Sequence, residues 1–332
     1  MPHRGRGISL WHRLQSLSWL GCGCATMPPR HLAVGNLNLD MYVVVDYIPG
    51  PDENSIAREA YLGPGGAAAN YAVTVTGLGH EAGLVSHTGS EAGRLGLLRA
   101  LRERGVDTSH IVIHEGEMPG LVIILVAKDG ERTMITMRGA NNYLRGDEAA
   151  GEKVDALHVA SRGTEVFTRA ASSISARLVS YDPGASNARR EGPKILEVAR
   201  NLADVLVLNR VEYGYVSGGA GLSVARSLLG GRLGMIIVKL GAQGAVLFTR
   251  EGAWRVEAYR AGEPVDTTGA GDVFIATFNV FYLDTDDPLE ALKAASIAAG
   301  MKVTRRGAQS APGREEVERI LRTSPPAVKR LQ

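Results

Sequence analysis

The alternation of short apolar segments with helical patterns after Asn142 constrains the fold more than any other feature of this sequence. Apolar segments of strand length lie at 156–160, 178–182, 205–208 and 235–240, and stretches of helical length separate them. Strands that alternate with helices usually pair in parallel, because each helix carries the chain back across one face of the sheet. The sequence therefore predicts an α/β domain with a doubly wound, mainly parallel sheet and helices on both faces.

The first half of the chain predicts one more buried strand and a small β element. The apolar run at 31–35 ends in glycine, which is typical of a buried strand that leads into a turn. A later hairpin, whose turn is Asp129-Gly130, lies outside the alternating pattern. We expect a β lid from about 41–62 and 111–138 beside the α/β cleft. Helices are expected at 67–78, 92–104, 271–283 and 289–303.

The two ends of the chain differ from the rest. Residues 1–29 contain both cysteines and only a poor version of the apolar core that a signal peptide needs. We expect a disordered extension or a start codon assigned too early, because Met27 directly precedes the first strand; a targeting segment is the alternative. The folded domain is expected over 30–322, and 323–332 are expected to form a tail.

Charge and composition exclude several classes of function. The 37 Lys and Arg nearly balance the 35 Asp and Glu, so the charge does not favour a nucleic acid as partner. No apolar run reaches 18 residues, so we expect no membrane span. Cys22 and Cys24 have no second Cys or His cluster that would complete a zinc site. So few cysteines are typical of a cytoplasmic protein, which is the location we expect.

The run Asp266-Thr-Thr-Gly-Ala-Gly-Asp272 carries the strongest chemical signal. Glycine tolerates the backbone angles that let N–H groups converge on an anion, and the helical pattern after Asp272 adds a helix N-terminus that favours phosphate. A carboxylate beside that phosphate can accept the proton of an attacking hydroxyl. The alternative is a plain glycine turn in which Asp272 caps the helix. We interpret the run as the catalytic centre of a phosphotransferase.

Four further motifs accompany this run, in a fixed order along the chain. The five motifs are Gly35-Asn-Leu-Asn-Leu-Asp40, Gly65-Gly-Ala-Ala-Ala-Asn70, Asn209-Arg-Val-Glu212, the run 266–272, and Thr304-Arg-Arg-Gly-Ala-Gln-Ser310. Together they resemble the signatures of the ribokinase-like (PfkB) carbohydrate and nucleoside kinases. The resemblance covers about residues 30–320 and is closest in pattern to archaeal nucleoside kinases and phosphofructokinase-B enzymes. It implies the ribokinase-like fold and an ATP-dependent kinase with an alcohol group as acceptor.

The resemblance implies a role for each motif. Asp272 would be the general base that activates the acceptor hydroxyl, and the backbone of Gly269, Ala270 and Gly271 would form the anion hole for the transferred phosphoryl group. The residues implied to hold the acceptor are Asn38, Asp40, Gly65, Gly66 and Asn70, although Asp40 also fits a plain turn. The residues implied to bind ATP are Asn209, Lys239, Gly241, Gly244 and Ser296.

Two ions are implied by the same resemblance. Glu212, three residues after Asn209, would hold Mg²⁺ through water, which suits an ion that keeps several waters. The same spacing also fits a helix capping box. Asp266 and Thr268, together with 307–310, resemble a loop in which carbonyl groups and one carboxylate bind K⁺, so K⁺ is a candidate second ion.

The sequence leaves the acceptor open. We favour a nucleoside or a free sugar that is phosphorylated on its hydroxymethyl group. Arg138 and Arg162 are expected near the pocket and suit a phosphate or carboxylate, although both also fit a solvated surface. A 6-phosphofructokinase, or another kinase of sugar phosphates or keto-sugar acids, is therefore the alternative. Against it, Glu117-Met-Pro-Gly-Leu121 lacks the basic residue that hexose-phosphate members usually carry after the lid strand.

Two further expectations concern the class of protein and its assembly. A non-catalytic sugar or nucleotide sensor is the alternative from a different class, but the sequence retains both the base and the anion hole. Exposed lid strands in the resembled family often pair, so a homodimer formed through the β lid is expected.

Overall fold

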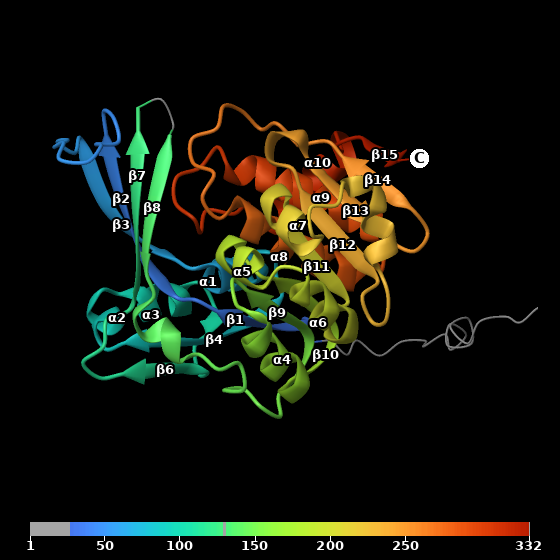
Figure 1. The fold of residues 1–332 in the computed structure, drawn as a ribbon, viewed down its shortest axis with the longest axis horizontal. Coiled ribbons are helices and arrows are strands. Elements are labelled where there is room, and N and C mark those ends of the chain that lie inside the picture. Colours follow the sequence, from blue (N-terminus) through green and yellow to red (C-terminus); the bar gives the residue numbers. More distant parts are fainter. Residues whose placement is uncertain (1–26, 129–130, 332) are drawn as a thin grey trace, which may run out of the picture.

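The main sheet confirms the predicted architecture (Figure 1). The computed structural model describes residues 27–128 and 131–331. In this part of the chain the strands of the main sheet are β1 (Arg30–Gly35), β4 (Glu81–Gly89), β5 (Val106–Asp107), β6 (Ile111–His114), β9 (Lys153–Ala160), β10 (Ser175–Asp182), β11 (Val205–Asn209), β12 (Met235–Lys239), β13 (Ala245–Phe248), β14 (Ala253–Val256) and β15 (Val328–Leu331). Their order is β15-β14-β13-β12-β11-β10-β9-β1-β4-β5, and β6 also pairs with β4. The strands from β12 to β5 are parallel, whereas β13, β14 and β15 add an antiparallel edge.

Helices cover both faces of this sheet, as predicted (Figure 1). One face carries α1 (Ala67–Gly77), α8 (Ala270–Thr285), α9 (Pro288–Lys302) and α10 (Arg314–Thr323); the other carries α4 (Thr164–Ser173), α6 (Lys194–Leu202) and α7 (Arg210–Val216). Successive strand residues alternate between the two cores: Ile237 packs on the first side, and Ile236 and Val238 pack on the second. All three side chains are fully buried, and each stabilises the fold by about 1.5–3 kcal/mol.

The carboxyl ends of the central strands collect the residues of the predicted site. The register places Gly35 of β1 beside Ala160 of β9, and Asn209 of β11 beside Lys239 of β12. Because parallel strands end at the same edge of a sheet, the residues that follow them meet there. The edge that ends β1, β9, β10, β11 and β12 is therefore where a ligand is expected.

A second, four-stranded sheet projects from the α/β body (Figure 1). Its strands are β2 (Asn38–Val45), β3 (Glu59–Gly65), β7 (Gly120–Ala127) and β8 (Arg132–Met137), in the order β3-β2-β7-β8. It comes from the segments in which we expected the lid, except that 111–114 form β6 of the main sheet. The expected turn Asp129-Gly130 lies outside the described residues. Since β2 begins three residues after β1 ends, this sheet adjoins the carboxyl edge.

Two further segments differ from the expected elements. The helix expected at 92–104 is divided into α2 (Glu91–Arg94) and α3 (Leu97–Glu103), because Gly96 between them adopts φ +74° in the left-handed region. The expected tail contains β15, which pairs with β14 at the sheet edge. Residues 1–26 of the expected extension lie outside the described residues. Among the described helices, none combines the length and apolarity that a membrane crossing requires.

Candidate active site

The run predicted to bind phosphate forms the N-terminus of α8. Gly269 is the N-cap with φ +77°, and a Cβ at this position would lie 2.4 Å from the carbonyl oxygen of Ala308. Only glycine fits this turn without strain. The N–H groups of the first helical turn have no preceding turn to bond to, and the helix dipole favours an anion there. The N–H of Ala270 is only weakly bonded within the protein, since it donates a long hydrogen bond of 3.3 Å to the carbonyl of Thr267.

Asp272 lies in the first turn of α8 and contacts α1. Its Oδ2 accepts a hydrogen bond of 2.8 Å from Nδ2 of Asn70. Burial raises the pKa of Asp272 to about 7, although the bond from Asn70 and the charge of Lys239 act to lower it. A carboxyl group whose pKa lies near neutrality can accept and release a proton under physiological conditions. Position and pKa therefore both suit a general base.

The residues predicted to hold the acceptor lie where the lid sheet leaves the α/β body. Asn38, Asp40 and Asn70 are buried. Within the described protein, Oδ1 of Asp40 and Oδ1 of Asn70 have no hydrogen-bond partner. A buried acceptor without a partner costs about 1–3 kcal/mol unless a ligand supplies a donor. These two oxygens are therefore suited to bind hydroxyl groups.

Glycines keep the space around Asp40 open. A Cβ on Gly65 would lie 2.1 Å from Oδ2 of Asp40, and one on Gly66, where φ is +97°, would lie 2.3 Å from the carbonyl oxygen of Asn36. Burial, followed by the negative charges of Asp272 and Asp266, raises the pKa of Asp40 to about 7. The negative charge of Asp272 thus contributes to the raised pKa of Asp40.

Asn141, which sequence reasoning did not single out, connects this group to Arg162. Its Nδ2 donates to Oδ1 of Asn38 at 3.0 Å, and its backbone carbonyl accepts a bond of 2.5 Å from Nη2 of Arg162. Arg162 is buried, its Nε has no partner within the described protein, and it lines a cavity of about 330 Å³ with the exposed Arg138. Burial, followed by the charge of Arg138, lowers the pKa of Arg162 to about 10. The structure thus links Arg162 to Asn38 through Asn141, whereas Arg138 is shown only to line the same cavity as Arg162.

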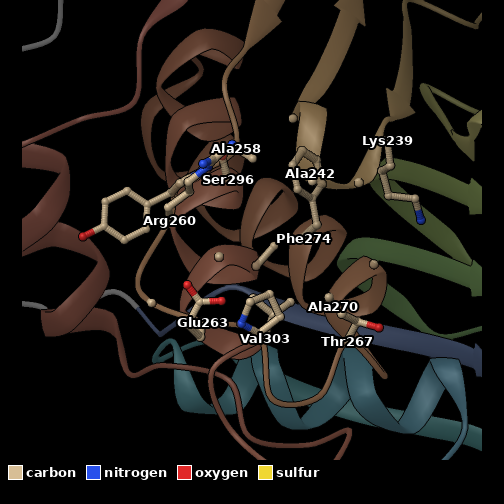
Figure 2. Close-up of a pocket in the computed structure, with 18 residues that line it drawn as sticks. Lys239, Ala242, Ala258, Arg260, Glu263, Thr267, Ala270, Phe274, Ser296 and Val303 are labelled. Carbon is tan, nitrogen blue, oxygen red and sulfur yellow. The ribbon is translucent and has the colours of Figure 1, made fainter. Parts of the chain in front are cut away.

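A cavity of about 530 Å³ borders the N-terminus of α8 (Figure 2). Figure 2 shows Ser296 and Arg260 toward one end of this cavity, and Lys239 and Thr267 toward the other. Its size lies in the range of small-molecule sites. Four of the five residues predicted to bind ATP line it: Lys239, Gly241, Gly244 and Ser296.

Lys239 lies at the end of this cavity that borders the N-terminus of α8. A Cβ on Gly271 would lie 3.1 Å from Nζ of Lys239. The ammonium group donates a bond of 2.8 Å to Oδ2 of Asp182. Burial lowers the pKa of Lys239, but the carboxylates of Asp182 and Glu212 outweigh this effect and raise the pKa above its usual value. Sequence reasoning missed Asp182, although its position at the end of a predicted strand was a usable signal.

Asn209 and Glu212 form the capping box that the sequence left as an alternative. The Asn209 side chain accepts bonds from the N–H groups of Val211 and Glu212, and the Glu212 carboxylate accepts a bond of 2.7 Å from the Asn209 N–H. Burial, followed by the charge of Asp182, raises the pKa of Glu212 to about 7. In the described part of the chain, no group of three or more His, Cys, Asp or Glu side chains could hold a metal directly. Glu212 and Asp182 offer carboxylate oxygens, which suit Mg²⁺, an ion that keeps several of its waters.

Asp266 and Thr268, the expected K⁺ ligands, make bonds within the protein. Oδ1 of Asp266 accepts a bond of 2.9 Å from the Thr268 N–H, and Oδ2 accepts one of 2.9 Å from the Gly307 N–H. Arg132 of β8 donates to Oδ1 of Asp266 at 3.3 Å and to the Thr268 hydroxyl at 3.2 Å. The lid sheet thus contacts the loop that precedes the anion hole. Lys302, which sequence reasoning also missed, contacts the same loop from α9.

A doubly wound α/β domain with a carboxyl group of raised pKa in the first turn of a helix, where the helix end favours an anion, suits a small-molecule phosphotransferase. Residues 29–314 match the pfkB family of carbohydrate kinases, and the chain belongs to this family. The protein is therefore an ATP-dependent phosphotransferase, as the resemblance implied.

Its relatives share the whole domain. The chain is 30% identical over 305 residues to an ATP-dependent ribose-1-phosphate kinase of Halopiger xanaduensis, which covers 88% of this chain and 98% of the relative. It is 27% identical over 310 residues to a ribokinase of Haemophilus influenzae, which covers 87% and 97%. Among solved structures, ribokinase from Thermotoga maritima superposes with a TM-score of 0.75 at 28% identity, covering 90% of this chain and all of that chain. A nucleoside kinase from Methanocaldococcus jannaschii has a TM-score of 0.78 at 24% identity, covers 90% of this chain and 99% of that chain, and supports the fold.

Proposed function

We propose that this protein transfers the terminal phosphoryl group of ATP to the hydroxymethyl group of a nucleoside or a sugar. The observation that carries the proposal is the position of Asp272. It lies in the first turn of α8, where we propose that phosphate binds, and it accepts a hydrogen bond of 2.8 Å from Asn70, one of the residues predicted to hold the acceptor. Its neighbour Gly271 lines the cavity of about 530 Å³, whose size suits a nucleotide. A base between an acceptor site and a phosphate site is the arrangement that phosphoryl transfer needs.

The residues divide the reaction between them. Asp40 and Asn70 bind acceptor hydroxyls through their unpartnered oxygens and direct the hydroxymethyl group toward Asp272. Asp272 takes the hydroxyl proton as the new oxygen–phosphorus bond forms and the bond to the ADP oxygen breaks. The N–H groups at Gly269 and Gly271, with Lys239 beside them, stabilise the negative charge on the transferred group. Mg²⁺ would enter with ATP, held through water by Glu212 and Asp182, and would neutralise phosphate charge.

The acceptor is tested by measuring ADP release from ATP with adenosine, inosine, ribose, fructose 6-phosphate, ribose 1-phosphate and 2-keto-3-deoxygluconate. We expect turnover with at least one of these, and its loss in EDTA. ATP hydrolysis that no acceptor stimulates would contradict the proposal. We propose the cytoplasm as the site of action, because two cysteines are few.

The pH dependence of kcat/KM is expected to follow the ionisation of the carboxyl groups in the site. Asp272 and Asp40 each have a pKa raised to about 7, so each loses its charge as pH falls through about 7. The base must be ionised to accept a proton, so kcat/KM is expected to fall about tenfold per pH unit below pH 7. The check is a kcat/KM profile from pH 5 to 9 beside the same profile for Asp40→Asn. A flat profile down to pH 5 would contradict both the role of Asp272 and its raised pKa.

A sugar phosphate is the second candidate acceptor, and Arg162 favours it. A buried guanidinium with an unpartnered Nε, next to Arg138 and linked to Asn38 through Asn141, is suited to an anionic group on the acceptor. The Halopiger xanaduensis relative is named for such a substrate. Arg162→Met is expected to raise KM for a phosphorylated acceptor at least tenfold and leave KM for ATP unchanged. Equal effects on phosphorylated and neutral acceptors would eliminate this candidate.

We also propose that two copies of the chain pair through the lid sheet. Large apolar side chains on its strands are about half exposed: Leu62 52%, Met134 53%, Ile135 53% and Met137 50%. Exposed apolar surface of this kind is often an interaction site that a partner covers. Light scattering on the native protein measures the assembly directly, and a monomer at micromolar concentration would reject the pairing.

A further inference from the structure

Lys302, the last residue of α9, is a lysine whose side chain is fully buried. Its ammonium group donates a bond of 2.6 Å to the backbone carbonyl of Asp266 and a longer one of 3.4 Å to the carbonyl of Arg305. Oδ2 of Asp266 lies 3.9 Å away. Removing an ammonium group from water is costly, and a fold keeps one only where oxygens replace the water. The surroundings of Nζ are therefore built to hold a cation.

The loop that this ammonium group binds leads directly into the anion hole. Asp266 lies three residues before Gly269, the N-cap of α8. Its carboxylate accepts bonds from the N–H groups of Thr268 and Gly307. Gly269 in turn packs on Ala308, so the segments 266–269 and 305–308 must keep their spacing for the N–H groups at the start of α8 to converge on an anion. The ammonium group fixes this spacing because it bonds to one carbonyl in each segment, that of Asp266 and that of Arg305.

A free K⁺ does not fit this arrangement. K⁺ is held by several carbonyl oxygens that replace its water. Here the carbonyls of Asp266 and Arg305 already bind Nζ, and the Asp266 carboxylate faces a second cation, Arg132. Another positive ion would lie among like charges in a buried site, where repulsion is poorly screened.

We propose that the ammonium group of Lys302 is a built-in monovalent cation, which holds the loop 266–269 in the shape of the anion hole and makes phosphoryl transfer independent of K⁺. Lys302 is thus a positioning residue that acts through the loop and does not touch the substrate. The charged groups near it are Asp266, whose Oδ2 lies 3.9 Å from Nζ, and Arg132, which contacts the same carboxylate. The inference rests on the proposed phosphoryl transfer at Asp272.

The test compares wild type with Lys302→Ala and Lys302→Met at constant ionic strength in KCl, NaCl or tetramethylammonium chloride. Wild-type kcat is expected to agree within about twofold in the three salts. Lys302→Met, which keeps the length and removes the charge, is expected to lower kcat by roughly 10²-fold or more in every salt. Lys302→Ala, which leaves space beside the carbonyls, is expected to recover at least tenfold in KCl over tetramethylammonium chloride. Lys293→Met, on the same helix but only partly buried, serves as the matched control and is expected to behave as wild type.

The melting temperature supplies a readout that does not depend on activity. K⁺ is expected to raise the Tm of Lys302→Ala more than that of wild type, because an ion that binds only the folded state stabilises it. Tenfold or greater activation of the wild type by K⁺ would overturn the inference, whether or not the variants fold. Wild-type turnover by Lys302→Met would overturn it as well. Absence of kinase activity in the wild type would instead reject the proposed function, and the K⁺-dependent Tm of Lys302→Ala would still decide the cation site.

Discussion

Asp272→Asn is expected to lower kcat by roughly 10²–10⁴-fold, which corresponds to about 3–5 kcal/mol of transition-state free energy. The amide keeps the size of the carboxylate and can still accept the bond from Nδ2 of Asn70, so the helix end should keep its structure. It cannot take the proton of the acceptor hydroxyl. ATP binding, measured by calorimetry, is expected to change little, because the nucleotide cavity is lined by other residues.

Asp52→Asn is the matched control for this substitution. Asp52 is exposed in the turn after β2 and has φ +62°, a conformation that asparagine tolerates. The control is expected to keep wild-type kcat and Tm. A kcat for Asp272→Asn within tenfold of wild type would show that another group is the base. Loss of ATP binding in the same variant would show that Asp272 supports the nucleotide site instead.

Gly269→Ala is expected to lower kcat by about 10²–10³-fold, the effect of losing anion-hole donors. Alanine at φ +77° is strained by about 1–2 kcal/mol, and its Cβ would collide with the carbonyl of Ala308 at 2.4 Å. The loop must shift to relieve this contact, and the N–H groups at the start of α8 then lose their common direction. We also expect Tm to fall by several degrees. Turnover and thermal unfolding measured on the same preparation check both effects.

Gly151→Ala is the control that separates backbone strain at positive φ from the steric collision with Ala308. Gly151 has φ +90°, and a Cβ there meets nothing within 4 Å. This variant is expected to show a lower Tm from the left-handed backbone alone, with unchanged kcat. If Gly269→Ala also loses only stability, the N–H groups of this turn do not stabilise the transferred phosphoryl group.

The parts of the fold that follow local rules could be predicted from the sequence. Apolar strand-length segments that alternate with helices dictate a parallel sheet covered on both faces, and the central strands lie where expected. The run 266–272 could be assigned to a helix N-terminus because glycine and helical spacing act locally. Lid segment 111–114 was misplaced because its pairing with β4 depends on contacts distant in sequence. Strand β15 was missed for the same reason, since only β14 gives those residues a partner.

The long-range contacts within the candidate site could not be predicted from the sequence. Asn141 bonds to Asn38 from 103 positions away, and Lys239 reaches Asp182 across 57 positions. The sequence alone indicates only that Lys302 is a charged residue at the end of a helix, where lysine is common. Only the fold shows that its ammonium group is fully enclosed and bound to the loop before the anion hole.

The phosphate position in the product tests the central claim most directly. The acceptor that best stimulates ADP release is incubated with ATP, and the product is examined by ¹H–³¹P correlation NMR. We expect the transferred phosphorus to couple to the methylene protons of the hydroxymethyl group, with one ADP formed per product molecule and no product from Asp272→Asn. Phosphorus on a ring hydroxyl, or ADP accompanied only by inorganic phosphate, would contradict the account.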